Sequence, residues 1–168
     1  MTAPFLSLSE SADVRIDQRG SLEVLYETKD VVLKRSFSKK GVFRGMHIQM
    51  PPYQQTKLIR VVEGRILDFI VDMNSADNKV FWKEVASNDG WIKIASYMAH
   101  GFYAIEDTVF EYICDGGYSE ASEQTFSIRK FLDEVIGLRN LNISDKDKAA
   151  AELNVVSGMP IENLKVII

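Results

Sequence analysis

The sequence predicts a mainly β protein, an antiparallel sandwich or jelly roll that carries a short, partly helical appendage at its C-terminus. Short runs of apolar, β-branched and aromatic residues alternate with polar residues at a period of two, as they do along half-buried strands. Clusters rich in Gly, Asn, Asp, Ser and Lys separate these runs, which is typical of sheets joined by turns. The runs that we expect to form strands are residues 21–26, 31–37, 57–62, 65–73, 91–97, 102–105 and 108–114.

The clearest of these strands is the segment 65–73. Its odd-numbered residues from 67 to 73 would face one side and its even-numbered residues from 66 to 72 the other, and each set contains large apolar side chains. Apolar residues on both faces indicate a strand that is covered on both sides. The run 57–62 precedes it, and Glu63-Gly64 between them predicts a tight hairpin.

The last third of the chain has a different pattern. Residues 127–138 predict a short amphipathic helix or an irregular segment, and residues 146–153 are rich in helix formers, with Ser144 or Asp145 as the N-cap. A chain of 168 residues has the length of one domain. We therefore expect a single domain over 1–168, with a jelly roll in 1–126 and a mixed appendage in 127–168.

Composition restricts the class of protein. With 46% hydrophobic and 26% charged residues, the chain has the balance of an ordered globule, and its net charge of −4 disfavours nucleic-acid binding. One cysteine cannot form an internal disulfide. No apolar run reaches the roughly 20 residues of a membrane span, and the N-terminus lacks a signal-peptide pattern. These features predict a soluble, cytoplasmic protein without a membrane or nucleic-acid partner.

Only two histidines, His47 and His100, are available for chemistry. The H-x-H pair of many β-barrel metal sites is absent because residue 49 is Gln, although the two histidines with acidic residues remain an alternative metal site. The single cysteine, Cys114, excludes a thiolate zinc site. Neither a phosphate-binding glycine loop nor a G-x-S-x-G nucleophile motif occurs. General acid–base chemistry by a histidine with Lys, Tyr and Asp partners remains.

Each candidate residue also has an ordinary structural interpretation. Tyr112 suits half-buried packing on a strand, and Lys57 suits a solvated charge at a strand start. Asp147 suits the first turn of a helix, where a carboxylate stabilises the helix dipole. Residue types alone leave both interpretations open.

The order of several motifs is more specific. Along the chain these are 17–20 (DQRG), 41–49 (GVFRGMHIQ), 51–52 (PP), 55–64 (QTKLIRVVEG), 68–72 (DFIVD), 99–102 (AHGF), Tyr112, Tyr118 and 143–147 (ISDKD). Together they resemble, over roughly residues 17–150, the dTDP-4-dehydrorhamnose 3,5-epimerase family. The resemblance implies a homodimeric, cupin-type jelly roll that uses neither a metal nor another cofactor.

The resemblance also implies a reaction. The substrate would be a nucleoside-diphosphate 4-keto-6-deoxyhexose for surface-polysaccharide synthesis, epimerised at C3, C5 or both through an enolate. By resemblance His47 is the base, Asp147 holds its imidazole, Lys57 stabilises the C4 oxygen, and Tyr112 is the acid on the opposite face of the sugar. The residues that the resemblance assigns to substrate binding are Arg19, Arg44, Gln49, His100 and Tyr118. For His100 a structural role stays an alternative.

The sequence departs from the family pattern in several places. Val32 and Lys34 stand where a Q-x-N pattern is usual, residues 94–98 lack the usual Pro and Gly, and Lys130 replaces an expected Trp. These departures leave open whether the nucleotide is dTDP or CDP, which sugar is bound and which carbon is inverted. A 3,4-ketoisomerase, a non-catalytic sugar-nucleotide binding module and a metal-dependent cupin are the alternative functions.

Overall fold

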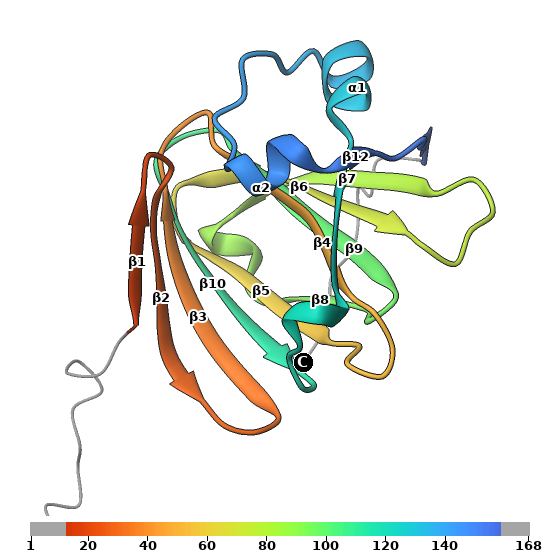
Figure 1. The fold of residues 1–168 in the computed structure, drawn as a ribbon. Coiled ribbons are helices and arrows are strands. Elements are labelled where there is room, and N and C mark those ends of the chain that lie inside the picture. Colours follow the sequence, from red (N-terminus) through yellow and green to blue (C-terminus); the bar gives the residue numbers. More distant parts are fainter. Residues whose placement is uncertain (1–12, 159–168) are drawn as a thin grey trace, which may run out of the picture.

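Two curled, mostly antiparallel sheets face each other and enclose an open barrel (Figure 1). The computed structural model describes residues 13–158. The order of the first sheet is β1 (Val14–Asp17), β2 (Gly20–Glu27), β3 (Val31–Ser38), β10 (Thr108–Asp115), β5 (Thr56–Glu63) and β8 (Ile92–Ile94). The order of the second is β12 (Ala151–Glu152), β11 (Glu123–Ser127), β4 (Phe43–Gln49), β9 (Met98–Ala104), β6 (Arg65–Asp72), β7 (Lys79–Ala86) and β13 (Val156–Ser157). The prediction of a cupin-like antiparallel jelly roll is confirmed.

The hairpin predicted at Glu63-Gly64 is wrong. β5 pairs with β10 and β8, whereas β6 pairs with β9 and β7, so the chain crosses from one sheet to the other at this point. Gly64 makes this corner with φ of 85°, and a Cβ there would lie 2.4 Å from the carbonyl oxygen of Asp107. The same glycine turn can join two paired strands of a hairpin or two strands that belong to different sheets. Which of the two forms depends on the pairing with strands distant in sequence.

The two apolar faces predicted for β6 are both buried. Ile66 points into the barrel and joins a cluster that includes Ile59 and Phe110. Phe69 and Val71 point outward and pack in a second cluster, whose other members include Phe131 and Leu132 of the C-terminal segment. Covering both faces of this strand therefore requires residues from beyond position 126.

The covering segment contains a helical turn, α1 (Arg129–Phe131), that continues as a π-helical turn, η4 (Leu132–Ile136), and a second helix, α2 (Asp145–Ala149). Short 3₁₀ turns, η2 (Ser87–Asp89) and η3 (Glu120–Ser122), lie between strands. The helix expected over 146–153 ends early because Ala151 and Glu152 pair with β11 as β12. Ser144 is its N-cap, as expected, and its hydroxyl accepts a hydrogen bond from the amide of Asp147 at 3.1 Å.

Other strand predictions differ in extent. β1, β4, β7 and β11 were not predicted, β8 covers only part of the run 91–97, and β9 begins at Met98, earlier than expected. Residues 1–12 and 159–168 lie outside the described part of the chain, so the single domain over 1–168 and the absence of a leader remain predictions. Among the helices of residues 13–158, none combines the length and the apolar character that a membrane span requires.

A buried carboxylate ties three neighbouring strands of the first sheet together. Glu111 of β10 lies opposite Arg35 of β3 and Arg60 of β5, and its side chain is 5% exposed. It accepts hydrogen bonds from Arg35 Nε at 2.9 Å and from Arg60 Nε at 2.8 Å. Burial alone would raise the pKa of this carboxyl, but the two guanidinium groups lower it below its ordinary value. Glu111 is therefore ionised in the folded protein.

We predict that Glu111→Gln lowers the free energy of unfolding by about 1–3 kcal/mol, since an amide leaves two half-exposed arginines without their shared carboxylate. Urea unfolding at neutral pH measures the change. Because folding lowers the pKa of Glu111, the difference should be complete above the ordinary carboxyl pKa and shrink as the pH falls through the folded-state value. Glu84→Gln, which removes an exposed partner of Arg65, is the control and should leave unfolding unchanged. Equal stability of the Glu111 variant and the wild type would contradict the prediction.

Candidate active site

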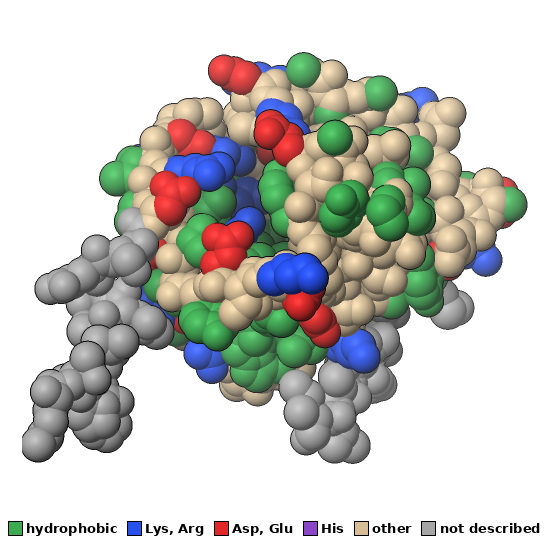
Figure 2. Space-filling model, turned by 60° about the horizontal axis from the view of Figure 1, so that its bottom comes forward, with side chains coloured by type: hydrophobic (Ala, Val, Ile, Leu, Met, Phe, Trp, Pro, Cys, Tyr) green, Lys and Arg blue, Asp and Glu red, His purple; other side chains and the backbone are tan. Residues whose placement is uncertain are grey.

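A cavity of about 420 Å³ opens between the two sheets. In the view of Figure 2, a hollow on the face of the molecule contains Lys and Arg side chains. Of the site residues proposed from the sequence, those that line the cavity are Arg19, Arg44, His47, Lys57, His100, Tyr112 and Tyr118. Gln49 lines a smaller, adjoining cavity of about 100 Å³ together with His47 and Lys57. The fold thus gathers residues from four strands, from the turn between β1 and β2 and from the segment after β10 around one space.

His47 and Asp147 form the central pair of the site. His47 Nε2 lies 2.8 Å from Asp147 Oδ1, and the Asp147 side chain is 2% exposed. Arg19 Nη1 lies 3.6 Å from the other carboxylate oxygen. Burial would raise the pKa of Asp147, but the hydrogen bond and charge of His47, with Arg19, lower it below its ordinary value. An ionised Asp147 accepts a hydrogen bond from the Nε2–H group, which leaves the unprotonated Nδ1 of a neutral imidazole free to act as a base.

Local packing places the two histidines side by side. His47 of β4 lies directly opposite His100 of β9, so both side chains face the cavity. The strands approach closely here because they meet at glycines: a Cβ on Gly45, whose φ is 125°, would lie 2.5 Å from the Cα of Gly101. A larger residue at either position would push the strands apart, which explains the R-G-M-H and A-H-G-F patterns in physical terms.

Lys57 of β5 lies deep in the cavity. Its Nζ donates a hydrogen bond to the backbone oxygen of His47 at 3.2 Å, and it forms no ion pair with any described carboxylate. Burial, with a contribution from the neighbouring Lys34, lowers the pKa of its ammonium group. An ammonium group without an anionic partner stabilises negative charge that develops on a ligand.

Tyr112 of β10 faces the same cavity and keeps its proton. Burial raises the pKa of its phenol well above the ordinary value. Its neighbour on that face, Cys114, lies opposite Lys57 in the paired strands, so Tyr112 and Lys57 come from adjacent positions of the inner surface. A protonated phenol on this wall can donate a proton to a bound molecule.

The remaining predicted residues have different surroundings. Arg44 is held by the Ser38 hydroxyl at 2.8 Å and by the Phe37 backbone oxygen at 3.2 Å, without an ion pair among the described residues. Burial and the charge of Arg19 lower the pKa of the Arg44 guanidinium. His100 Nε2 lies 2.7 Å from the buried Asp68, so His100 is fixed in the fold and also lines the cavity.

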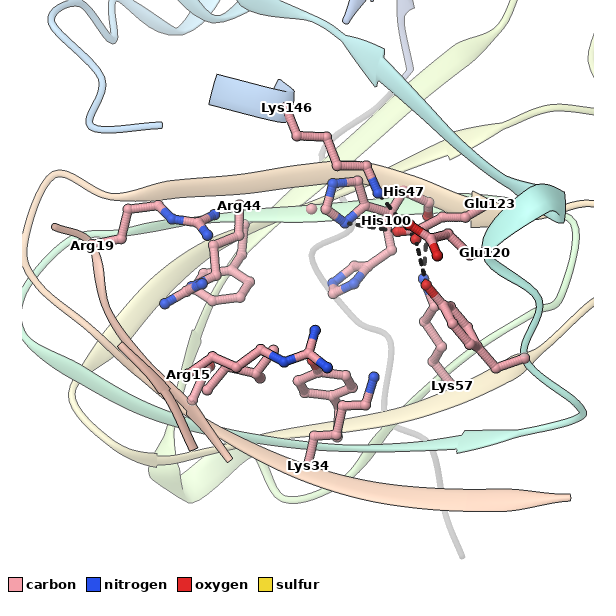
Figure 3. A pocket seen from close by; sticks show the side chains of 16 residues that line it. Arg15, Arg19, Lys34, Arg44, His47, Lys57, His100, Glu120, Glu123 and Lys146 are labelled. Atoms are coloured by element: carbon pink, nitrogen blue, oxygen red, sulfur yellow. Dashed lines mark hydrogen bonds and ion pairs between the residues drawn. The ribbon is translucent and has the colours of Figure 1, made fainter. Parts of the chain in front are cut away.

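Tyr118 contacts the carboxylate of Glu123, which the sequence analysis did not identify as a site residue. The hydroxyl of Tyr118 donates to Glu123 Oε2 at 3.0 Å, and Lys146 Nζ lies 3.0 Å from the same oxygen. Glu123 Oε1 is 3.9 Å from His47 Nδ1 (Figure 3). Burial raises the pKa of Tyr118, with Glu123 adding to the effect, to about 12. No local signal identified Glu123 because β11 was not predicted, whereas Lys146 adjoins Asp147 within the matched 143–147 segment.

Among residues 13–158 there is no group of three or more His, Cys, Asp and Glu side chains arranged to hold a metal ion. The described site is a cluster of ionisable and cationic groups. By fold and site, the molecule is a cupin-like barrel with a His–Asp pair, a partly buried lysine and a protonated tyrosine around one charged cavity.

Comparison with known proteins identifies the family. Residues 11–154 match the dTDP-4-dehydrorhamnose 3,5-epimerase family, and the chain belongs to it. The dTDP-4-dehydrorhamnose 3,5-epimerase of Shigella flexneri is 35% identical over 122 residues, which are 67% of this chain and 65% of that protein. The chain therefore matches slightly less than two thirds of the length of this relative.

Solved structures agree in fold. The dTDP-4-dehydrorhamnose 3,5-epimerase of Sulfolobus tokodaii superposes with a TM-score of 0.64 and 33% identity, covering 83% of this chain and 85% of that one. The dTDP-6-deoxy-D-glucose-3,5-epimerase of Legionella pneumophila, solved in complex with dTDP-4-keto-L-rhamnose, has a TM-score of 0.64 and 27% identity, covering 86% of each chain. The resemblance read from the motifs is confirmed, and the family match extends a few residues beyond them at both ends.

We predict that Lys57→Met raises the free energy of unfolding by about 1–2 kcal/mol, because it removes a partly buried charge that has no anionic partner among residues 13–158. Urea unfolding at neutral pH measures this change. The control is Lys29→Met at an exposed turn position, which should leave the unfolding midpoint unchanged. A less stable Lys57 variant would show that the ammonium group serves packing or hydrogen bonding in the fold.

Proposed function

We propose that this protein is an isomerase, a nucleotide-sugar epimerase that inverts C3, C5 or both of a dTDP- or CDP-linked 4-keto-6-deoxyhexose. One observation carries the proposal: His47, held by Asp147, faces the same cavity as Lys57, which has no ion-pair partner among the described residues. Membership of the epimerase family and the sugar nucleotide bound to the Legionella relative support it.

The chemistry begins at the ketone. The C4 carbonyl acidifies the hydrogens on C3 and C5, and His47 takes one of them as a proton. The electron pair of the broken C–H bond moves into an enolate whose negative charge lies on the C4 oxygen. Lys57 stabilises this oxygen, and Asp147 stabilises the imidazolium that His47 becomes.

Inversion requires a proton from the other side of the ring. Tyr112 returns a proton to the carbon from the face opposite His47, and the phenolate and imidazolium then exchange protons with solvent. Atoms and electrons balance without an oxidant or a cofactor. Arg19 and Arg44 would bind the diphosphate, since a guanidinium group pairs with two phosphate oxygens at once. Gln49, His100 and Tyr118 would complete the contacts to the substrate.

The assembly and setting of the protein are part of the same proposal. We expect a cytoplasmic homodimer that uses no metal or other cofactor and supplies a deoxysugar for surface polysaccharide. Size-exclusion chromatography with light scattering and metal analysis of the purified protein test these expectations.

Incubation with dTDP-4-keto-6-deoxyglucose in D₂O tests the reaction. We predict that the wild type introduces deuterium at C3, C5 or both, that His47→Ala abolishes the exchange, and that Tyr112→Phe retains exchange but loses inversion, because exchange needs only the base. Proton NMR of the product reports both steps. Tyr103→Phe is the matched control, since Tyr103 packs in the outer cluster, and it should behave as the wild type. Absence of deuterium at both carbons with dTDP- and CDP-linked substrates, or a ketone moved to another carbon, would contradict the proposal.

We predict that Asp147→Asn lowers the exchange rate about 10²- to 10⁴-fold while dTDP binding is retained, because an amide cannot stabilise the imidazolium. NMR of samples quenched at successive times measures the exchange rate, and calorimetric titration with dTDP measures binding. Asp145→Asn on the same helix is the control: its side chain is 97% exposed and, within residues 13–158, forms an ion pair only with Lys148, so exchange should be unchanged. Full activity of the Asp147 variant would remove the His–Asp pair from the mechanism.

A further inference from the structure

One arginine lies between two carboxylates where β1 turns into β2. The side chain of Asp17 accepts hydrogen bonds from Arg19 Nη2 at 2.6 Å and from Arg19 Nε at 3.0 Å, and its other oxygen accepts one from the Arg19 amide at 2.8 Å. These hydrogen bonds lower the pKa of the Asp17 carboxyl below its ordinary value, although burial opposes the change. Asp17 is therefore an ionised partner that holds Arg19 along one edge of the guanidinium group.

On its other side Arg19 approaches the His–Asp pair without a hydrogen bond to it. Arg19 Nη1 lies 3.6 Å from Asp147 Oδ2, which is beyond hydrogen-bond distance. This oxygen is buried and has no hydrogen-bond partner in the described structure, whereas Oδ1 of the same carboxylate holds His47. Buried polar atoms are nearly always satisfied, so a donor that stops just short of one indicates that another contact holds the donor back.

The rigid shape of the guanidinium group makes Asp17 the contact that sets this distance. The N–H donors of arginine lie in one plane, and Asp17 binds the donor on Nε and a donor on Nη2, which fixes the direction of that plane. In Figure 3 the side chain of Arg19 extends toward the interior of the cavity. Held in this way, Arg19 can offer its remaining donors to a diphosphate while it stays short of Asp147.

Arg19 and a protonated His47 compete for the single carboxylate of Asp147. A carboxylate that is bonded to a guanidinium group stabilises a second positive charge less, so His47 would lose proton affinity if Arg19 came closer. The other charged and titratable groups that face His47 from the elements around it are Lys34, Lys57, His100, Tyr112, Glu123 and Lys146. Within residues 13–158 Asp17 forms no hydrogen bond or ion pair with any of these, so its contact with the pair runs through Arg19.

We propose that Asp17 is a positioning residue: it holds Arg19 away from Asp147 Oδ2 and thereby keeps the carboxylate of Asp147 available to the imidazolium of His47. The inference rests on the proposed function, because it treats His47 as the base. With Asp17 in place, Arg19 serves the diphosphate and His47 remains basic. Without the Asp17 carboxylate, Arg19 bonds to Asp147, and His47 becomes a weaker base.

A pH titration of the histidine rings by proton NMR tests the inference without substrate. The chain has two histidines, and the signal that disappears in His47→Ala belongs to His47. We expect Asp17→Asn to lower the pH at which the His47 ring is half protonated by about 0.5–1 unit, because a cation moves closer. Arg19→Gln removes that cation and should raise the same midpoint. In the double variant the midpoint should equal that of Arg19→Gln alone, because Asp17 acts through Arg19.

Two further variants serve as controls. Asp13→Asn removes the same charge from a nearby side chain that is 62% exposed, and it should leave the midpoint unchanged. Asp17→Glu keeps the carboxylate and should retain the wild-type midpoint. A midpoint that is unchanged or raised in Asp17→Asn refutes the inference, and so does a shift that persists when Arg19 is replaced. If Asp17→Asn does not fold, Arg19→Gln decides alone, since a midpoint that does not rise there refutes the competition.

Deuterium exchange separates this inference from the proposed function. With dTDP-4-keto-6-deoxyglucose in D₂O, the acid limb of the exchange profile should move in Asp17→Asn in the same direction as the NMR midpoint. If the wild type exchanges no deuterium, the epimerase proposal fails, and the NMR titration still decides whether Asp17 acts on the pair of His47 and Asp147. If the wild type exchanges deuterium but the midpoint stays fixed in Asp17→Asn, the inference fails and the epimerase proposal stands.

Discussion

The hydrogen bond between His47 and Asp147 joins two parts of the chain that are 100 residues apart in sequence. His47 stands on a strand in the middle of the second sheet, and Asp147 stands in the first turn of α2. The capping hydroxyl of Ser144 and the pairing of β12 with β11 hold that helix over the barrel end. The C-terminal segment is therefore part of the site, because without it the imidazole would lack the carboxylate that orients it.

The same segment also completes the core, so stability and site geometry have a common origin. Phe131 and Leu132 cover the outer face of β6, while the inner face packs against residues of the opposite sheet. Two buried apolar clusters offset the unfavourable burial of Lys57, which has no anionic partner among the described residues. The cavity with these cations lies between two sheets whose apolar clusters are buried.

Local patterns predicted the elements better than their pairing. Alternation along 65–73 correctly indicated a strand covered on both faces, and Ser144 was found as a cap because capping depends on a few adjacent residues. The hairpin at Glu63-Gly64 failed because a glycine turn serves equally as a corner between sheets. The helix over 146–153 was too long, since pairing with β11 overrode the propensity of Ala151 and Glu152. β7 was missed because Lys79–Ala86 follows a polar loop that dominated the local signal.

The sequence alone determined the fold class, the family and the residue types of the candidate site, because these follow from alternation, turn residues and the order of short motifs. Only the tertiary structure decided that Glu123 and Lys146 join His47 and that Gln49 lies beside the main cavity. It also decided that Lys34 and Ser36 line this cavity without an ion pair or a side-chain hydrogen bond to any described residue. These facts depend on contacts between strands distant in the chain and on which charges neutralise one another. Ion pairs and buried contacts form only between side chains that the fold brings together. The spacing of residues along the chain does not specify which side chains these are.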